Sequence, residues 1–275
     1  MKYIVFTILM FFYCFSAFAN PRDTSVYKVK SQKESRFYFY WGYNRAFFAL
    51  SDIHFKGPNY DFTLYDISAA DRPSKFGAVY VKPSTITIPQ YNYRLGYRLN
   101  NRWTISLGMD HMKYVIRNHQ KSTISGYIDS LESKNYSGQY QNDTITIRND
   151  FLQFEHTDGL NNISLDIEYS FLKIPLYKNS LRLNFIGSFG GLVVIPRTDV
   201  TLFGHRVNNK FHLSGYTFNA KLAPRIEWKS RLFLESTIRC GYMILPDILV
   251  NTSDAIRADQ NISYLMYSLA VGVYF

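Results

Sequence analysis

Three residues carry side chains that could do chemistry together: Asp110, His156 and Asp158. A carboxylate beside a histidine can orient the imidazole as a general base, or the pair can activate a water molecule. Glu155 precedes His156 and adds another acidic group at the same place. The three candidates share one strand parity, which would direct them to the same side of a sheet. Catalysis, metal binding and structural hydrogen bonding are the three roles open to them.

The remaining sequence offers no motif for a metal or a cofactor. No short spacing of histidines or cysteines predicts a metal site. The sequence also lacks a glycine-rich phosphate loop and a CxxC motif. We therefore expect neither a metal nor a cofactor.

A second group of charged residues alternates with apolar residues along several segments. Such charges are tolerated in an interior when they are paired and hydrogen-bonded. A small barrel of about eight strands is filled by its own side chains, which favours a polar network over an ion pathway. The residues expected to face inward are Arg94, Arg98, Asp166, Glu168, Arg182, Lys221, Arg225, Glu227, Glu235 and Arg239.

Strands must position all of these side chains. Segments in which polar and apolar residues alternate have the period of a β-strand, and about 9 to 11 residues suffice to cross a bilayer as a tilted strand. In one of them, Phe218 and Leu222 alternate with Asn219 and Lys221. Eight such segments lie near residues 36–48, 86–99, 102–116, 160–172, 181–195, 211–228, 231–245 and 261–275.

The connections between these segments alternate in length. Short turns are expected at 100–101, 173–180 and 229–230, and long polar loops at 49–85, 117–159, 196–210 and 246–260. Outer-membrane barrels have short periplasmic turns and long extracellular loops. The strand count stays open, because "SDIHFKG" with "DFTLYDI", or "KSTISGYI" with "DTITIRNDFLQF", could form hairpins within the loops.

Aromatic residues make up 17% of the chain, and 23 residues are tyrosines. Tyr and Trp are enriched where rings lie at a membrane interface. Trp103, Trp228 and Phe275 fall beside short turns or at the end of the last strand, as members of an aromatic girdle would. A soluble sandwich also alternates, but it needs no order of long and short loops. The sequence therefore predicts a closed antiparallel transmembrane β-barrel of about eight strands.

The first residues predict export. Lys2 precedes an apolar run, and Ala17 and Ala19 fit a small-residue cleavage site, so 1–19 are interpreted as a signal peptide. The apolar run is shorter than the roughly 20 residues of a spanning helix. Residues 20–275 would then form the barrel domain, with 20–35 as a periplasmic lead-in. The formal charge of +10 is dispersed along the chain, which does not favour nucleic acid as a partner.

Several segments together resemble a family of outer-membrane β-barrel proteins of Bacteroidetes-type bacteria. They are "SDIHFKGPNYDFTLYD", "TITIPQYNYRLGY", "ISLGMDHMKYV" and "FLQFEHTDGLN". The resemblance covers nearly all of the chain after the signal peptide and implies an outer-membrane location. It carries over no catalytic residue, because the family has no assigned activity. We expect outer-membrane lipids and lipopolysaccharide as partners, and the barrel-assembly machinery as a partner of the C-terminal strand.

Three functions follow as hypotheses. The first is a non-enzymatic barrel whose long loops contact envelope components or external ligands. The second is a hydrolase at the outer rim, but the lipid A deacylase pattern needs a serine two residues after its histidine, where this chain has Asp158. The third is a small channel.

Overall fold

The computed structural model describes residues 35–177, 180–251 and 256–275. The expected signal peptide, 1–19, and all of the expected lead-in except residue 35 lie outside the described residues. Within the described part there is no helix whose length and apolar character would allow it to cross a membrane. Nearly all of the regular structure is antiparallel β-sheet.

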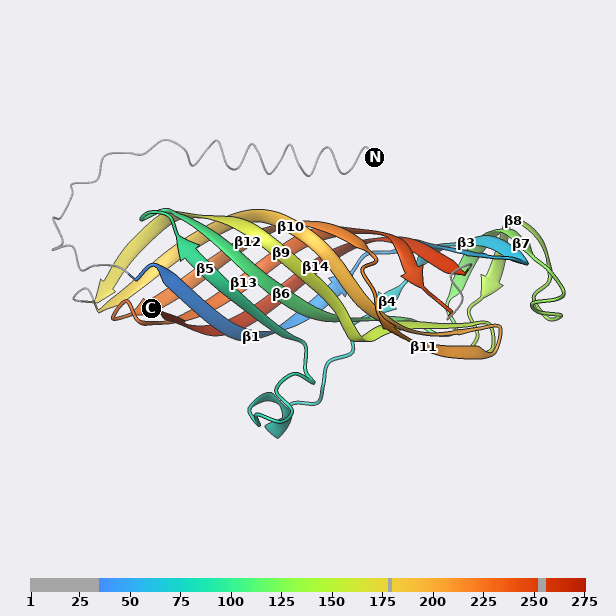
Figure 1. Cartoon of the computed structure of the whole chain (residues 1–275), viewed down its shortest axis with the longest axis horizontal. Coiled ribbons are helices and arrows are strands. Elements are labelled where there is room, and N and C mark those ends of the chain that lie inside the picture. The colour runs from blue at the N-terminus through green and yellow to red at the C-terminus, as the bar shows by residue number, and fades with distance from the viewer. Residues whose placement is uncertain (1–34, 178–179, 252–255) are drawn as a thin grey trace. The chain divides into compact units, whose positions relative to one another are not determined.

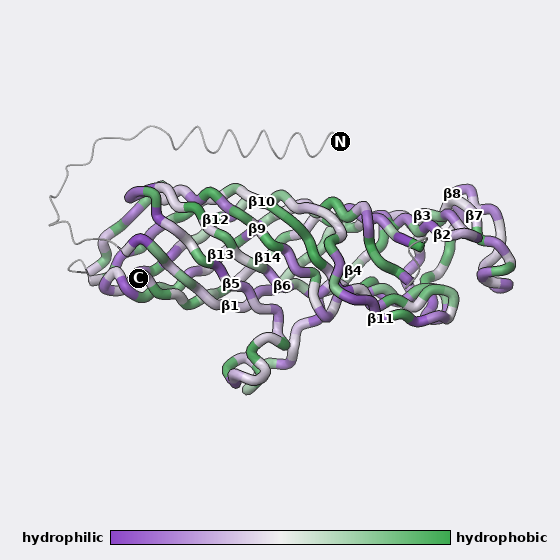
Figure 2. Tube along the Cα trace, viewed as in Figure 1, coloured by the Kyte–Doolittle hydropathy of each residue, from purple (hydrophilic) through white to green (hydrophobic). Residues whose placement is uncertain are grey.

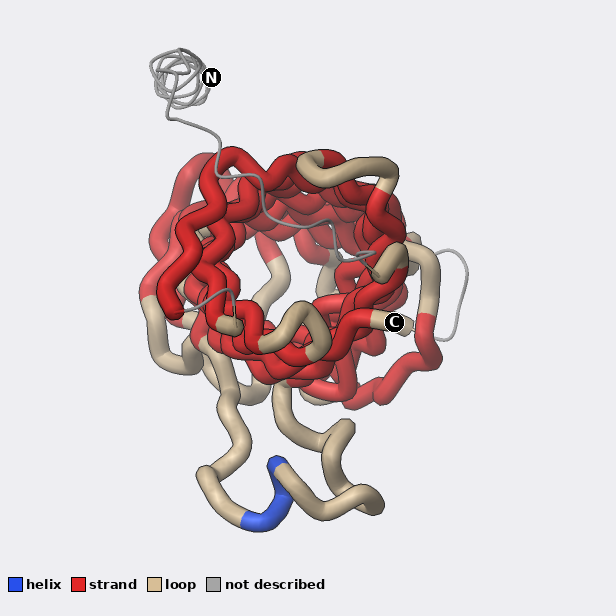
Figure 3. Tube along the Cα trace, turned by 90° about the vertical axis from the view of Figure 1, so that its left-hand side faces the viewer, coloured by secondary structure: helices blue, strands red, loops and turns tan. Residues whose placement is uncertain are grey.

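Eight strands form a closed ring, as the sequence predicts (Figures 1 and 3). Each pairs antiparallel with the next, and the last pairs with the first, from Tyr38 opposite Tyr274 to Phe48 opposite Tyr264. In ring order the strands are β1 (Phe37–Phe48), β5 (Tyr91–Arg98), β6 (Trp103–Ile116), β9 (Leu152–Tyr177), β10 (Leu181–Leu202), β12 (Gly215–Trp228), β13 (Leu232–Leu249) and β14 (Arg257–Tyr274).

The predicted facing of the strands is confirmed in the half of the barrel next to the short turns. On β12, Phe218, Leu222 and Ile226 are exposed on the outside, whereas Asn219 and Lys221 are buried inside. Figure 2 shows the same alternation of hydrophobic and hydrophilic residues around the ring. Closing the ring gives every strand two neighbours, so no unpaired edge faces outward at this level.

The long connections differ from the expectation, because much of their length is strand. Both hairpins left open by the sequence are present: β2 (Ser51–Gly57) pairs with β3 (Tyr60–Ile67), and β7 (Lys121–Ile128) pairs with β8 (Gly138–Thr146). Two further strands, β4 (Ala69–Ala70) and β11 (His205–Phe211), pair with β6 and β10.

These additions lengthen the wall of the barrel beyond the ring. β2 continues along β14, and β3 pairs with β7, so the sheet extends well past the level at which β5 begins (Figure 1). We call this part the extracellular extension: β2, β3, β4, β7, β8 and β11, with the adjoining ends of β6, β9, β10, β13 and β14. The predicted strand at 86–99 is shorter than expected, because β5 starts only at Tyr91.

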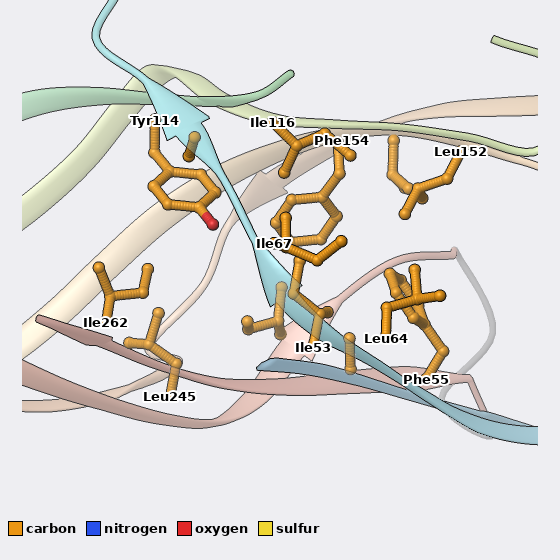
Figure 4. Close-up of a cluster of buried hydrophobic side chains, with 14 of the residues drawn as sticks. Ile53, Phe55, Leu64, Ile67, Tyr114, Ile116, Leu152, Phe154, Leu245 and Ile262 are labelled. Carbon is orange, nitrogen blue, oxygen red and sulfur yellow. The ribbon is translucent and has the colours of Figure 1, made fainter. Parts of the chain in front are cut away.

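The extracellular extension has a hydrophobic interior. Phe55, Phe62, Tyr114, Phe154 and their neighbours form one buried cluster between the walls (Figure 4). On β2 the outward positions are instead polar. This arrangement is the reverse of the ring next to the short turns, where the inside is polar and the outside apolar. The surrounding solvent explains the reversal. Because water surrounds the extension, burial of apolar side chains in its interior stabilises it.

Candidate functional site

One carboxylate in the polar interior is held by arginines from two different parts of the wall. Asp166 on β9 accepts a hydrogen bond from Arg94 Nη1 on β5 at 2.6 Å and another from Arg239 Nη2 on β13 at 2.9 Å. Asp110 on β6 lies 3.7 Å from Arg94 and 3.6 Å from Arg239. All four side chains are buried, so two cations meet two carboxylates away from water. Such pairing offsets the cost of burying the charges.

A second cluster lies beside the first. Glu168 accepts hydrogen bonds from Lys221 Nζ and from Tyr38 Oη, both at 2.8 Å. Lys221 is also 3.5 Å from Glu235, which accepts a 2.6 Å hydrogen bond from Arg225 Nε. Lys221 thus links two carboxylates, and the chain of bonds crosses the interior from β9 to β13 through β12.

The network ends near the short turns, around Glu227. This carboxylate accepts hydrogen bonds from Arg182 Nε at 2.9 Å, Tyr274 Oη at 2.7 Å and Asn184 Nδ2 at 3.1 Å. Arg98 lies 3.7 Å from the same group. The structure therefore places all ten residues of the sequence-predicted interior set in one connected region of ion pairs and hydrogen bonds.

Sequence reasoning missed the aromatic part of this interior. The Arg225 guanidinium carbon lies 4.5 Å from the ring centroid of Tyr38 and 4.2 Å from that of Phe233. Tyr38 itself covers Gly96 so closely that a Cβ at residue 96 would lie 2.0 Å from the ring. Phe233 covers Gly272 in the same way. The sequence contained a signal for this packing. Tyr38 has the inward parity on its strand, and an inward-facing ring needs a small residue such as Gly96 beside it.

The three rim candidates are not brought together. Asp110 belongs to the interior network described above, below the extension. His156 lies in the extension, beside the rings of Tyr114 and Phe154, and its Nδ1 is 3.1 Å from Thr198 Oγ1. Asp158 lies on the outer surface, where its side chain is 53% exposed and 3.1 Å from Arg197. The expectation of a shared rim is therefore corrected.

A β-bulge explains why Asp158 does not face the side of the sheet that its strand parity predicts. Met112 on β6 pairs with Leu160 on β9, yet Tyr114 pairs with His156, so β9 contains extra residues between these two pairs. Gly159, within this stretch, has φ of 141°, a conformation that side-chain-bearing residues rarely adopt. The bulge turns Asp158 outward and breaks the alternation on which the prediction depended.

The surroundings of His156 do not suit a catalytic base. Burial among aromatic and aliphatic side chains lowers the pKa of His156 to about 3, so the imidazole is neutral at physiological pH. Its side-chain contacts include no carboxylate that would orient it. Among the residues that the structure describes, no three His, Cys, Asp or Glu side chains lie close enough together to hold a metal ion.

The outside of the ring is an apolar belt. Leu222 is 48% exposed and Val271 63% exposed, and neighbouring outward positions on β12, β13 and β14 are likewise large and apolar. Trp103, Trp228 and Phe275 are exposed on the outside at the end with the short turns. A continuous apolar surface around a closed sheet with a polar interior suits lipid and not water. The chain is an outer-membrane β-barrel.

A second set of exterior rings lies on β1 and β5 of this outer-membrane barrel. Trp41 stacks on Tyr91 with ring centroids 4.9 Å apart, and Tyr93 continues the stack on the same outer face. The sequence had indicated only the girdle next to the short turns.

Comparison with known proteins finds matches only at low identity and low TM-score. No family model matches the chain, and no curated protein matches it. Neisserial surface protein A is 12% identical, with 89% of this chain and 100% of that chain covered and a TM-score of 0.35. The outer membrane protein OprG from Pseudomonas aeruginosa is 7% identical, with 88% and 97% covered and a TM-score of 0.38.

The attachment invasion locus protein of Yersinia pestis is also 7% identical, with 86% of this chain and 99% of that chain covered and a TM-score of 0.28. A family specific to Bacteroidetes-type bacteria is not found among the matches. The assignment as an outer-membrane barrel therefore rests on the closed ring and its apolar belt.

Proposed function

We propose that this protein is a non-enzymatic outer-membrane barrel whose extracellular extension is a rigid surface for contact with molecules outside the cell or in the envelope. The observation that carries the proposal is the continuation of the wall beyond the belt around a packed hydrophobic core. Paired strands over a packed core keep a fixed shape, whereas irregular loops do not. A fixed shape lowers the entropy cost of binding.

The filled interior argues against the channel hypothesis. In the ring, the charged side chains bond across the lumen to one another, as Arg94 does to Asp166 and Lys221 to Glu168. Above them, side chains such as Phe55 and Phe154 fill the space between the walls. An ion would have to break these pairs and then pass an apolar core, so a conducting path is unfavourable.

The dispersal of the rim candidates argues against the hydrolase hypothesis. A catalytic histidine and its carboxylate need to lie within hydrogen-bond reach of each other and of substrate. Here Asp110 is sealed in the interior, and His156 is enclosed in the core of the extension. Neither is accessible to a lipid or a peptide.

The outermost contact surface is polar. The hairpin of β7 and β8 extends furthest from the belt in Figure 1. On β8, Gln139, Gln141, Asn142 and Asp143 are exposed. Asn142 is held in place because its backbone N–H donates to Ser125 Oγ on β7 at 3.0 Å. Amide and carboxylate groups fixed in this way suit a polar ligand, such as a saccharide or a polar protein surface.

Binding to an array of purified envelope polysaccharides and extracellular-matrix proteins tests this proposal. The full chain, folded in lipid nanodiscs, is compared with a variant in which Gln139, Gln141 and Asp143 are changed to Ala and 129–137 are replaced by a short Gly-Ser linker. That exchange leaves the pairing of β7 with β8 in place. We expect the full chain to bind at least one array component and the variant to lose that binding.

Two further measurements would overturn the proposal. Stable unit currents in planar bilayers would show a channel. A change in the mass of lipid A incubated with the folded protein would show a hydrolase. Equal binding by the full chain and the linker variant would move the contact surface away from the hairpin and also contradict the proposal.

A further inference from the structure

Between β4 and β5 the chain runs outside the barrel wall. After β4 it leaves the wall at Asp71 and returns at Gln90, just before β5. In Figure 1 this segment projects sideways from the barrel, and in Figure 3 it lies outside the ring of strands. It contains the short 3-10 helix η1 (Ala78–Tyr80). We call residues 73–89 the side loop.

The side loop is apolar and basic. Phe76 is 97% exposed and Val81 77% exposed, and Ile88 is exposed as well. Lys75 and Lys82 are its only charged residues, since 73–89 contain neither Asp nor Glu. An isolated exposed apolar residue is ordinary, but several on one short segment, flanked by lysines, indicate a contact surface. Aromatic and aliphatic residues with lysines are typical of segments that lie in a membrane interface.

The side loop is held against the barrel. Tyr43 Oη on β1 donates to the Tyr80 carbonyl oxygen at 2.5 Å, and the two rings pack edge to face. Arg45 Nη2 donates to Tyr80 Oη at 3.3 Å, and Tyr80 Oη donates to the Ser74 carbonyl oxygen at 3.0 Å. The residues that flank the loop are joined by a hydrogen bond from Gln90 to Asp71. The exposed side chains are therefore presented from a fixed position.

That position is level with the apolar belt. The loop ends two residues before Tyr91, whose ring stacks on Trp41 on the outer face of the belt. Tyr91 pairs with Tyr43 on β1, and Phe47, four positions further along β1, is still outward-facing and 65% exposed. The side loop thus leaves the wall no further out than the last apolar residues of the neighbouring strand. A segment projecting sideways at this level meets the lipid surface.

We propose that the side loop docks on the outer leaflet, with Phe76 and Val81 inserted among the acyl chains and Lys75 and Lys82 beside lipid phosphate groups. Charge complementarity and continuity with the belt single out an anionic lipid surface as the partner. A basic residue near an anionic membrane surface strengthens binding by about fivefold. The inference rests on the membrane-spanning ring alone and is independent of the proposed function.

A fluorescent label tests the docking. The native Cys14 and Cys240 are replaced by Ser, and an environment-sensitive fluorophore is attached to Ala78→Cys in the side loop. A matched label at Leu131→Cys, at the exposed tip between β7 and β8, serves as the control. The full chain is folded into phosphatidylcholine vesicles with and without phosphatidylglycerol, each prepared with ordinary or brominated acyl chains.

We expect brominated chains to quench most of the fluorescence at residue 78 and none at residue 131. Quenching at 78 should be stronger when phosphatidylglycerol is present. Lys75→Gln with Lys82→Gln should remove that increase, whereas Lys134→Gln, an exposed lysine near the control label, should not. An unquenched label at residue 78 would overturn the proposal, because it would place the loop in water or against protein. Quenching that ignores phosphatidylglycerol would refute the role of the lysines.

Discussion

Asp166 Oδ2 lies 2.6 Å from Arg94 Nη1, although 72 positions separate these residues in the chain. Both side chains are fully buried, and the same carboxylate oxygen also binds Arg239. The pair connects β5 to β9 across β6, so it joins strands that do not pair directly. Interior ion pairs of this kind fix the relative position of distant strands as well as satisfying their own charges.

Asp166→Asn should destabilise the barrel by about 3 kcal/mol, because removal of one partner leaves buried cations uncompensated. Asp110→Asn is the matched control, since Asp110 Oδ2 makes no hydrogen bond and its arginine contacts are longer. We expect it to cost about 1 kcal/mol. The two variants are folded in vesicles and unfolded in urea, and tryptophan fluorescence gives their midpoints. These midpoints show which variant is less stable. Equal midpoints would contradict the prediction that Asp166 stabilises the barrel more than Asp110 does.

Leu222→Arg should hinder insertion by about 2 to 4 kcal/mol, because residue 222 faces the acyl chains within the apolar belt. Leu131→Arg changes a leucine that is more exposed than Leu222, at the tip of the extension, where water surrounds the side chain. That control should fold as the parent does. The folded fraction in lipid vesicles, measured by the heat-dependent shift in gel mobility, distinguishes the two. A normal folded fraction for Leu222→Arg would count against the belt.

Gly96→Ala should destabilise the barrel by about 1 to 3 kcal/mol, because the new methyl group would displace the Tyr38 ring. Displacement would also break the hydrogen bond from Tyr38 to Glu168. Gly77→Ala is the control, since no atom lies within 4 Å of a Cβ at residue 77. Unfolding in urea is the measurement. A Gly96→Ala barrel as stable as Gly77→Ala would show that the ring can move freely.

His54 should make the extension more stable at low pH. Burial alone would lower its pKa, but its hydrogen bonds to Asp61 at 2.8 Å and Asp259 at 2.6 Å outweigh burial and raise the pKa above 6.5. A raised pKa means that the stabilisation is fully present below about pH 6.5 and is lost as pH rises through the folded-state pKa.

An NMR titration of the His54 ring gives the folded-state pKa directly. Resistance of the β2–β3 hairpin to proteolysis should fall as pH rises through that value. His54→Gln should remove this dependence, because the amide does not titrate. A titration midpoint at or below 6.5 would contradict the pairing with the two carboxylates.

The sequence by itself determined the ring. Along β12, β13 and β14 the alternation is local, and it records which side of each strand faces lipid and which faces the interior. Because that period depends only on neighbouring residues, the barrel class, the short turns and the inward set from Arg94 to Arg239 followed without a structure. The closing of β1 on β14 followed as well, since an unpaired edge is excluded from lipid.

Only the tertiary structure decided what depends on distant contacts. The bulge before Leu160 turned Asp158 outward, and the strand register placed Asp110 opposite Asn162 and His156 opposite Tyr114, at different levels of the wall. The local period does not predict the two extra residues. For a related reason, the sequence did not show that the long connections continue the wall of the barrel as strands. Beyond the membrane the surrounding solvent changes from lipid to water, so the same alternation buries apolar side chains where it had buried polar ones. The ring and the extension show the same period of two along the sequence. Only the packing of the walls in the structure shows which face of each strand is inside.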